Sequence, residues 1–142
     1  MLILARRTAD SPELIEAVAA RADRGPCNFT LIVPSSLRIL TNAAYWRPQR
    51  DIDAERRIAA AVPLLSRAAQ SEIVAVVGAQ DPVAAVRDAL KLMGFDEVIV
   101  SMLPPRLSRW RSLGVPGRIR ALGVPVTEVT GAEAPGTRLP AA

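Results

Sequence analysis

Histidine is absent from this 142-residue chain, and Cys27 is its only cysteine. Without histidine, the Ser-His-Asp triad, the Cys-His pair and the usual zinc sites are excluded. The chain also lacks the one side chain that titrates near neutral pH without a perturbing environment. A lone cysteine forms no intrachain disulfide and no multi-thiolate metal cluster, so we expect Cys27 to be an inert, small hydrophobic residue. Most hydrolase chemistry is thereby excluded.

The acidic residues offer no clear catalytic pair either. Asp51, Asp53 and Glu55 lie together at an expected helix start, where capping and the helix dipole by themselves favour acids. We therefore predict no catalytic residue and no metal site, and we favour a protein that is not an enzyme.

Long hydrophobic runs are also missing. Hydrophobic residues make up 50% of the chain and aromatic residues 4%, so the core must be built from alanine, valine, leucine and isoleucine. Residues 1–5 are apolar, but Arg6 ends this run far too early for a signal peptide. No other run approaches the roughly 18 to 20 apolar residues that a membrane span needs. We expect one compact cytoplasmic domain without a membrane partner.

Lysine is nearly absent, since Lys91 is the only one and the other basic residues are arginines. This bias is typical of a GC-rich coding sequence, and few aromatic side chains are present to stack on bases. The net charge of +4 therefore does not favour a nucleic-acid partner. No acidic residue occurs between Glu97 and Glu128. That stretch holds five arginines with no acidic neighbour in the sequence: Arg106, Arg109, Arg111, Arg118 and Arg120.

Short apolar, β-branched runs alternate with segments of helical periodicity. Five parallel strands joined by right-handed crossovers follow from this order, so we predict a Rossmann-like α/β fold, a three-layer αβα sandwich with a five-stranded parallel sheet. The domain spans 1–130, and 131–142 is expected to be a disordered tail. The expected strands are 2–5, 28–33, 73–77, 98–102 and 124–129, and the expected helices are 14–24, 53–70, 83–93 and 107–122.

Local signals refine these helices. Pro63 is expected to kink or divide the second helix, and Gly114 to break the last one. The third helix begins at the Asp81-Pro82 pair and ends at Gly94, and its buried face is predicted to run from Val83 to Met93 through Val86 and Leu90. Residues 35–50 have no clear period and should form a long connection at the carboxyl end of the second strand.

The order and spacing of these pieces resemble the universal stress protein family. Four features carry the resemblance: the capped first helix, the long connection after the second strand, the Asp81-Pro82 helix ending at Gly94, and the run 95–100 followed by Pro125-Val126. The resemblance covers roughly residues 1–130. It implies a fold of the adenine nucleotide alpha hydrolase type.

Members of that family that bind ATP are similar in a glycine signature after the fourth strand, whose backbone N–H groups wrap the phosphates. Here the first glycine position falls at Ser101 or Met102, the second falls at Pro104 or Pro105, and Gly114 is followed by valine. Because proline has no N–H, the loop loses donors where the signature supplies them. The first strand also runs into arginines where the family often places an aspartate near the adenosine.

The carboxyl ends of parallel strands are where open α/β sheets bind their ligands, and the acid-free stretch begins at such an end. We predict that Ser101, Arg106, Ser108 and Arg109 bind a phosphate or another anion with side chains instead of backbone amides. Arg106 and Arg109 are spaced to share one direction on a helix. The alternative is a solvated helix face with ordinary arginines.

For the two tryptophans, too, the sequence allows a functional role and a structural one. Trp46 and Trp110 are both expected near the carboxyl edge of the sheet. They either floor a ligand pocket together with Tyr45 or cover the end of the core, where alanine is too small. We favour the second role, cover of the core.

These observations lead to one functional hypothesis and two alternatives. The first is a non-catalytic, stress-related or regulatory protein of the universal stress protein type, without ATP binding of the glycine-loop kind. The second is a divergent nucleotide or anion binder that uses the arginines after the fourth strand. The third, an enzyme acting on a phosphorylated or adenylated small molecule, rests on fold analogy alone.

Cofactors and partners follow from the same hypotheses. No cofactor is assigned, and ATP or another adenine nucleotide stays open as the alternative. We expect a homodimer formed through the fifth strand, since that strand would otherwise be an exposed edge, and a small anionic ligand as partner.

Overall fold

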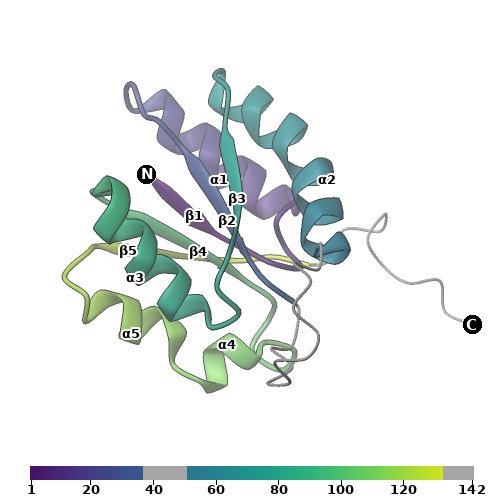
Figure 1. The fold of residues 1–142 in the computed structure, drawn as a ribbon. Coiled ribbons are helices and arrows are strands. Elements are labelled where there is room, and N and C mark those ends of the chain that lie inside the picture. Colours follow the sequence, from purple (N-terminus) through teal and green to yellow (C-terminus); the bar gives the residue numbers. More distant parts are fainter. Residues whose placement is uncertain (37–50, 133–142) are drawn as a thin grey trace, which may run out of the picture.

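The computed structural model describes residues 1–36 and 51–132 and contains one five-stranded parallel sheet (Figure 1). The strand order is β3-β2-β1-β4-β5, and every neighbouring pair is parallel. The predicted α/β class and the five strands are confirmed. The strands are β1 (Leu2–Leu4), β2 (Thr30–Pro34), β3 (Val74–Gly78), β4 (Val98–Met102) and β5 (Val126–Thr130).

Helices cover both faces of the sheet, so the architecture is a three-layer αβα sandwich (Figure 1). Two of them, α1 and α2, pack on one face, and α3 and α5 pack on the other, each pair over its own hydrophobic cluster. The helices are α1 (Pro12–Asp23), α2 (Ile52–Ala69), α3 (Pro82–Met93), α4 (Arg109–Ser112) and α5 (Val115–Arg120).

The central strand β1 divides its side chains between the two cores. Ile3 lies in the cluster under α1 and α2, whereas Leu2 and Leu4 lie in the cluster under α3 and α5. All three are fully buried. A strand buried on both faces reads as a continuous apolar run, which is why the first residues of the chain have no polar alternation.

The helix ends follow the sequence signals. Ser11 caps α1 and accepts a hydrogen bond from the Leu14 N–H at 3.2 Å. Asp81 caps α3 ahead of Pro82, and Gly94 ends that helix with a φ of 57°. Gly114, with a φ of 66°, separates α4 from α5, so the predicted break there is confirmed.

Two expectations about helices were wrong in part. Pro63 does not divide the second helix, because α2 runs through it without interruption. Both Pro63 and Ala59, whose carbonyl loses its helical donor, are exposed, so water can satisfy that oxygen. Met93 is not part of the buried face of α3 and is 59% exposed, because it is the last residue before the helix ends.

Some expectations fall outside the described residues. Most of the connection expected at 35–50, including Tyr45 and Trp46, lies there, and so does the tail from residue 133 onward. Gly131, which was assigned to that tail, is buried, and its N–H donates to the Met102 carbonyl at 2.9 Å, extending the β5 pairing.

The strand order fixes one special place in the sheet. From β1 the chain continues to β2 and β3 on one side, and then crosses to β4 on the other side. The carboxyl ends of β1 and β4 are therefore neighbours whose following loops diverge, which is the switch point where such sheets bind ligands. Among the described helices, none combines the length and apolar character needed to cross a membrane.

Candidate functional site

A pocket of about 240 Å³ opens at this switch point. Within the described residues, three segments line it: the turn after β1, the end of β4 with the loop that follows, and the first residues of α4. Its described lining residues are Arg6, Arg7, Thr8, Ser101, Met102, Leu103, Leu107, Ser108, Arg109 and Trp110.

Three guanidinium groups give the pocket a positive character. Arg6 and Arg7 come from the turn after β1, and Arg109 is the first residue of α4. None of the three forms an ion pair within 1–36 and 51–132, and no acidic side chain is found among the described lining residues. Arginine is the side chain best suited to planar, bidentate recognition of phosphate or carboxylate.

Arg6 is half-buried, whereas Arg7 and Arg109 are exposed. Burial has the largest effect and lowers the pKa of Arg6, Asp53 and Asp51 raise it, and the positive charges of Arg57 and Arg7 lower it. The net effect is a pKa below the usual value of 12.5, which still leaves the guanidinium charged at neutral pH. A desolvated cation next to other cations would be stabilised by an anion in the pocket.

Two buried hydroxyls form a pair in the pocket wall. Thr8 Oγ1 and Ser101 Oγ are 2.6 Å apart, and both residues are 1% exposed. One of the two hydroxyls donates to the other, so the proton of the accepting hydroxyl is not used in this bond. The pair also ties the turn after β1 to the end of β4.

Thr8→Val should remove one partner of this pair without changing the shape of the side chain. The remaining Ser101 hydroxyl would then be buried without that bond, and we expect the free energy of unfolding to fall by about 1–2 kcal/mol. In Thr8→Val/Ser101→Ala the loss should be smaller than the sum of the single losses, as chemical denaturation of the four proteins would measure. Additive losses would show that the two hydroxyls do not interact.

The loop after β4 uses its own polar groups internally. The Leu107 N–H donates to the Pro104 carbonyl at 2.9 Å, and Ser108 Oγ accepts from the Arg111 N–H at 3.3 Å. Arg111 Nε donates to the Leu103 carbonyl at 3.4 Å, and its guanidinium also reaches Thr130. These contacts fix the loop against β5.

The structure places the four predicted site residues differently. Ser101, Ser108 and Arg109 line the pocket. Arg106 lies in the exposed turn before α4 and is not among the lining residues, so the helical spacing from Arg109 does not apply to it.

The arginines of the acid-free stretch have more acidic partners than the sequence alone indicates. Carboxylates from elsewhere in the chain pair with three of its arginines. Arg120 and Arg111 approach Glu128 at 2.8 and 3.8 Å, and Arg118 approaches Asp81 at 4.0 Å.

Arg6, Arg7 and Thr8 are lining residues that the sequence did not nominate. Their signal was present, because they lie just beyond the carboxyl end of the buried strand β1, and Ser101 lies at the carboxyl end of β4. At the end of the first strand the universal stress protein family often has an aspartate, and its absence there was noted from the sequence. The arginines themselves were not predicted to be ligands.

The described lining residues also include an apolar wall. Met102, Leu103, Leu107 and Trp110 line the pocket together with the polar groups. Trp110 also packs against the hydrophobic cluster under α3 and α5, so it combines the two roles that the sequence left open for it. A ligand with one anionic end and one apolar end would match such a lining.

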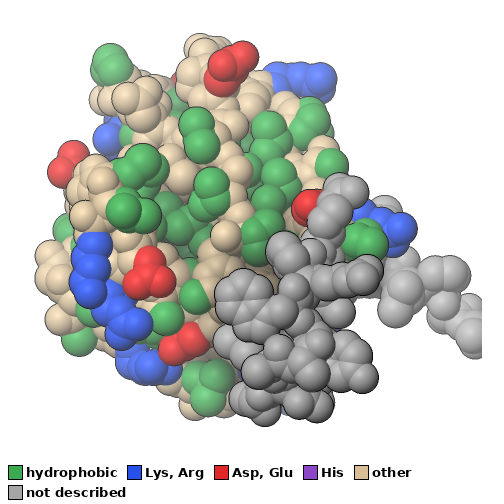
Figure 2. All heavy atoms as spheres, viewed as in Figure 1, with side chains coloured by type: hydrophobic (Ala, Val, Ile, Leu, Met, Phe, Trp, Pro, Cys, Tyr) green, Lys and Arg blue, Asp and Glu red, His purple; other side chains and the backbone are tan. Residues whose placement is uncertain are grey.

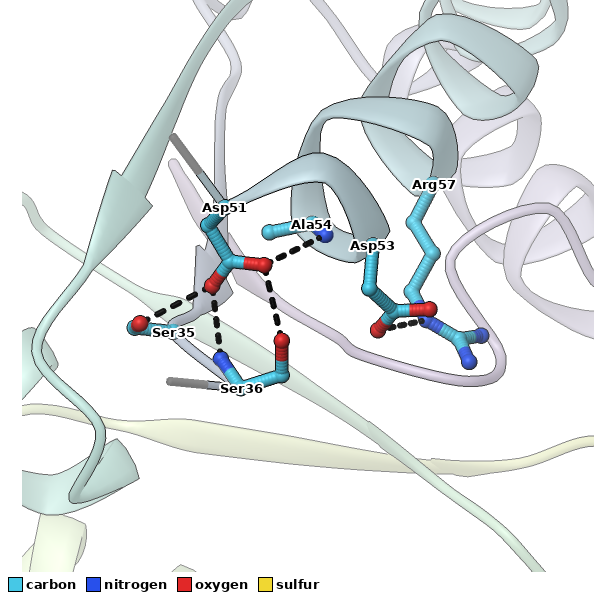
Figure 3. Close-up of polar contacts among 6 residues, drawn as sticks. All are labelled: Ser35, Ser36, Asp51, Asp53, Ala54 and Arg57. Atoms are coloured by element: carbon cyan, nitrogen blue, oxygen red, sulfur yellow. Dashed lines mark hydrogen bonds and ion pairs between the residues drawn. The ribbon is translucent and has the colours of Figure 1, made fainter. Parts of the chain in front are cut away.

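Beside the pocket, Asp51 joins the end of β2 to the start of α2 (Figure 3). Its carboxylate is 7% exposed and accepts four hydrogen bonds. Burial works against its ionisation, but the bonds from the Ala54 N–H and from Ser36 and Ser35 outweigh it and lower the pKa from 3.8 to about 2. Asp51 is the helix cap that the sequence indicated.

The described residues contain no group of three or more histidine, cysteine, aspartate or glutamate side chains that could hold a metal ion. Comparison of the chain with protein-family models finds no match, and comparison with curated proteins finds no significant one.

Proposed function

We propose that this protein is a non-catalytic, cytoplasmic binding protein of the universal stress protein type, and that its ligand is a small anion such as a phosphate ester. The observation that carries the proposal is the pocket at the switch point, lined by Arg6, Arg7 and Arg109 without an acidic side chain among its described lining residues. Hydroxyl groups of Thr8, Ser101 and Ser108 line the same pocket.

The loop after β4 supports recognition of the anion by side chains and not by the backbone of a glycine-rich loop. Pro104 and Pro105 have no N–H to donate, and the Leu107 N–H is already engaged in the turn. Three cationic side chains can supply the charge that backbone donors supply in a glycine-rich phosphate loop. An adenine nucleotide stays open as the ligand, bound in a manner that depends on arginine.

Arg109→Ala should weaken binding of AMP, or of inorganic phosphate, by about ten-fold to a hundred-fold, the loss expected for hydrogen bonds to a charged group. Arg6→Ala should have a similar effect, since both side chains line the pocket. Calorimetric titration of the full chain with AMP, ATP, phosphate and sulfate would measure these affinities.

Two variants with the same loss of charge serve as controls. Arg106→Ala changes the same loop at a residue that does not line the pocket, and Arg87→Ala changes the exposed side of α3. Both should bind with affinity within about two-fold of the original chain, the range expected for substitutions without direct contact. Equal losses in Arg106→Ala and Arg109→Ala, or no saturable binding of any of the four probes, would contradict the proposal.

The stress-related role and the homodimer remain predictions. The sheet has two edges that could serve a dimer, β5, as expected from the sequence, and β3. A mass measurement in solution decides whether the chain dimerises.

A further inference from the structure

The edge strand β3 exposes an unusual amount of apolar surface. Val74 is 59% exposed and Val76 is 44% exposed, although both belong to the sheet. Figure 2 shows hydrophobic side chains gathered over the middle of the face where β3 runs between α2 and α3 in Figure 1. Contiguous apolar patches of this kind mark interaction surfaces.

The exposure follows from the path of the chain. After β3, helix α3 crosses towards β4, and the hydrophobic cluster beneath α3 and α5 takes residues from β2, β1 and β4 but none from β3. Ala75 packs towards the α1 and α2 face, so its neighbours Val74 and Val76 point to the other face, where they lie outside the cluster under α3 and α5. Ala85 of α3 approaches Gly78, and Leu92, two helical turns further on the same side, is 83% exposed.

The edge itself lacks the features that keep edge strands apart. Natural sheets protect their edges with charged side chains, proline or bulges. No charged residue and no proline occurs from Ile73 to Gln80, and all five residues of β3 pair in continuous register with β2. Its outer backbone groups can be satisfied by another extended strand.

The opposite edge is protected. β5 has Glu128 at its centre, and Arg111 and Arg120 pair with that carboxylate. Antiparallel pairing of β5 with its own copy, centred on the strand, would place Glu128 opposite Glu128, and like charges in that position are destabilising.

We propose that β3 pairs antiparallel with β3 of a second copy of this chain, which joins the two sheets into one of ten strands. The charges beside β3 are compatible with a second copy as the partner. In a two-fold symmetric pair, residues close to the axis lie opposite the same residues of the other copy. Pairing centred on Val76 places Glu72 opposite Gln80 and Asp81 opposite Ser71, so neither carboxylate meets itself. The exposed valines Val74 and Val76 of both copies are buried together.

Sedimentation equilibrium of the full chain would test this pairing. We expect a mass twice that of the chain, which falls to the mass of one chain on dilution. Val76→Lys should be monomeric at every concentration, because it places a charge in the middle of the edge. Val76→Thr, which keeps the shape and β-propensity of the side chain, should weaken dimerisation several-fold and guards against a variant that fails to fold.

The matched control is Thr127→Lys, which adds the same charge to the exposed edge strand β5. It should leave the dimer intact. A monomeric original chain overturns the proposal, and so does a dimer that Thr127→Lys separates while Val76→Lys and Val76→Thr do not.

Discussion

Replacement of Asp51 by alanine is expected to lower the free energy of unfolding by about 3 kcal/mol, as a helix cap and several charge-assisted hydrogen bonds are lost together. The carboxylate accepts from Ser35 Oγ at 2.8 Å, from Ser36 N–H and Oγ at 2.7 Å each, and from the Ala54 N–H at 3.0 Å. Without it, the end of β2 and the start of α2 lose their shared anchor. Equilibrium denaturation by urea would measure the loss.

Asp53→Ala is the matched control, because Asp53 lies in the first turn of the same helix. Its side chain is 52% exposed and pairs with Arg57 at 3.1 Å. The Arg57 side chain of this pair is only 12% exposed, so we expect a loss of about 1–2 kcal/mol, which is smaller than that for the four Asp51 bonds. If both variants lose the same stability, the effect belongs to the helix dipole and not to the Asp51 bonds.

The same bonds predict a pH dependence. The pKa of Asp51 falls from 3.8 to about 2 on folding, so its stabilisation is complete above pH 3.8 and is lost as the pH falls towards 2. The shift corresponds to about 2 kcal/mol. Asp51→Asn should be less stable at neutral pH but should lose less stability on acidification between pH 5 and 2. An unchanged pH profile in Asp51→Asn would contradict this account.

Gly78→Val is expected to lower the free energy of unfolding by about 3 kcal/mol or more, because extra methyl groups in a packed core force neighbours out of place. Gly78 is the last residue of β3, and a Cβ there would lie 2.7 Å from Ile32 Cγ2 and 2.8 Å from Ala85 Cβ. Neither neighbour is the flexible end of a long side chain. Gly78→Ala should show a smaller loss of the same sign by thermal or urea denaturation.

Gly117→Ala should act in the opposite direction. Gly117 lies in α5, and a Cβ there would meet nothing within 4 Å. Replacing an exposed helical glycine with alanine stabilises by about 0.5–1 kcal/mol. Destabilisation at both glycines would mean that backbone freedom, and not close approach of α3 to the sheet, determines the result at Gly78.

The sequence predicted the fold well because its signals are local. Apolar runs, the Asp81-Pro82 cap, and the stops at Gly94 and Gly114 each depend on a few neighbouring residues. The exposure of β3 could not be predicted in this way, because 73–77 has the composition of a central strand. Only the crossing of α3 over the other strands leaves it uncovered.

The site was predicted in part for the same reason. Ser101 lies at the end of β4, Ser108 and Arg109 follow that strand, and all three were predicted from this position. Arg6 was not, because its role depends on β1 lying beside β4, which only the strand order establishes. The ion pair between Arg118 and Asp81 also joins residues far apart in the sequence, so no local pattern predicts it.

The Thr8–Ser101 bond joins residues 93 positions apart in the chain, and the pocket is built around that junction. The site therefore has no precursor in the unfolded chain or in either half of it, and it cannot exist during synthesis until β4 has joined β1. A ligand that binds there would bind only the completed fold. At a hundred times its dissociation constant it would add about 2.7 kcal/mol to the stability of that completed fold.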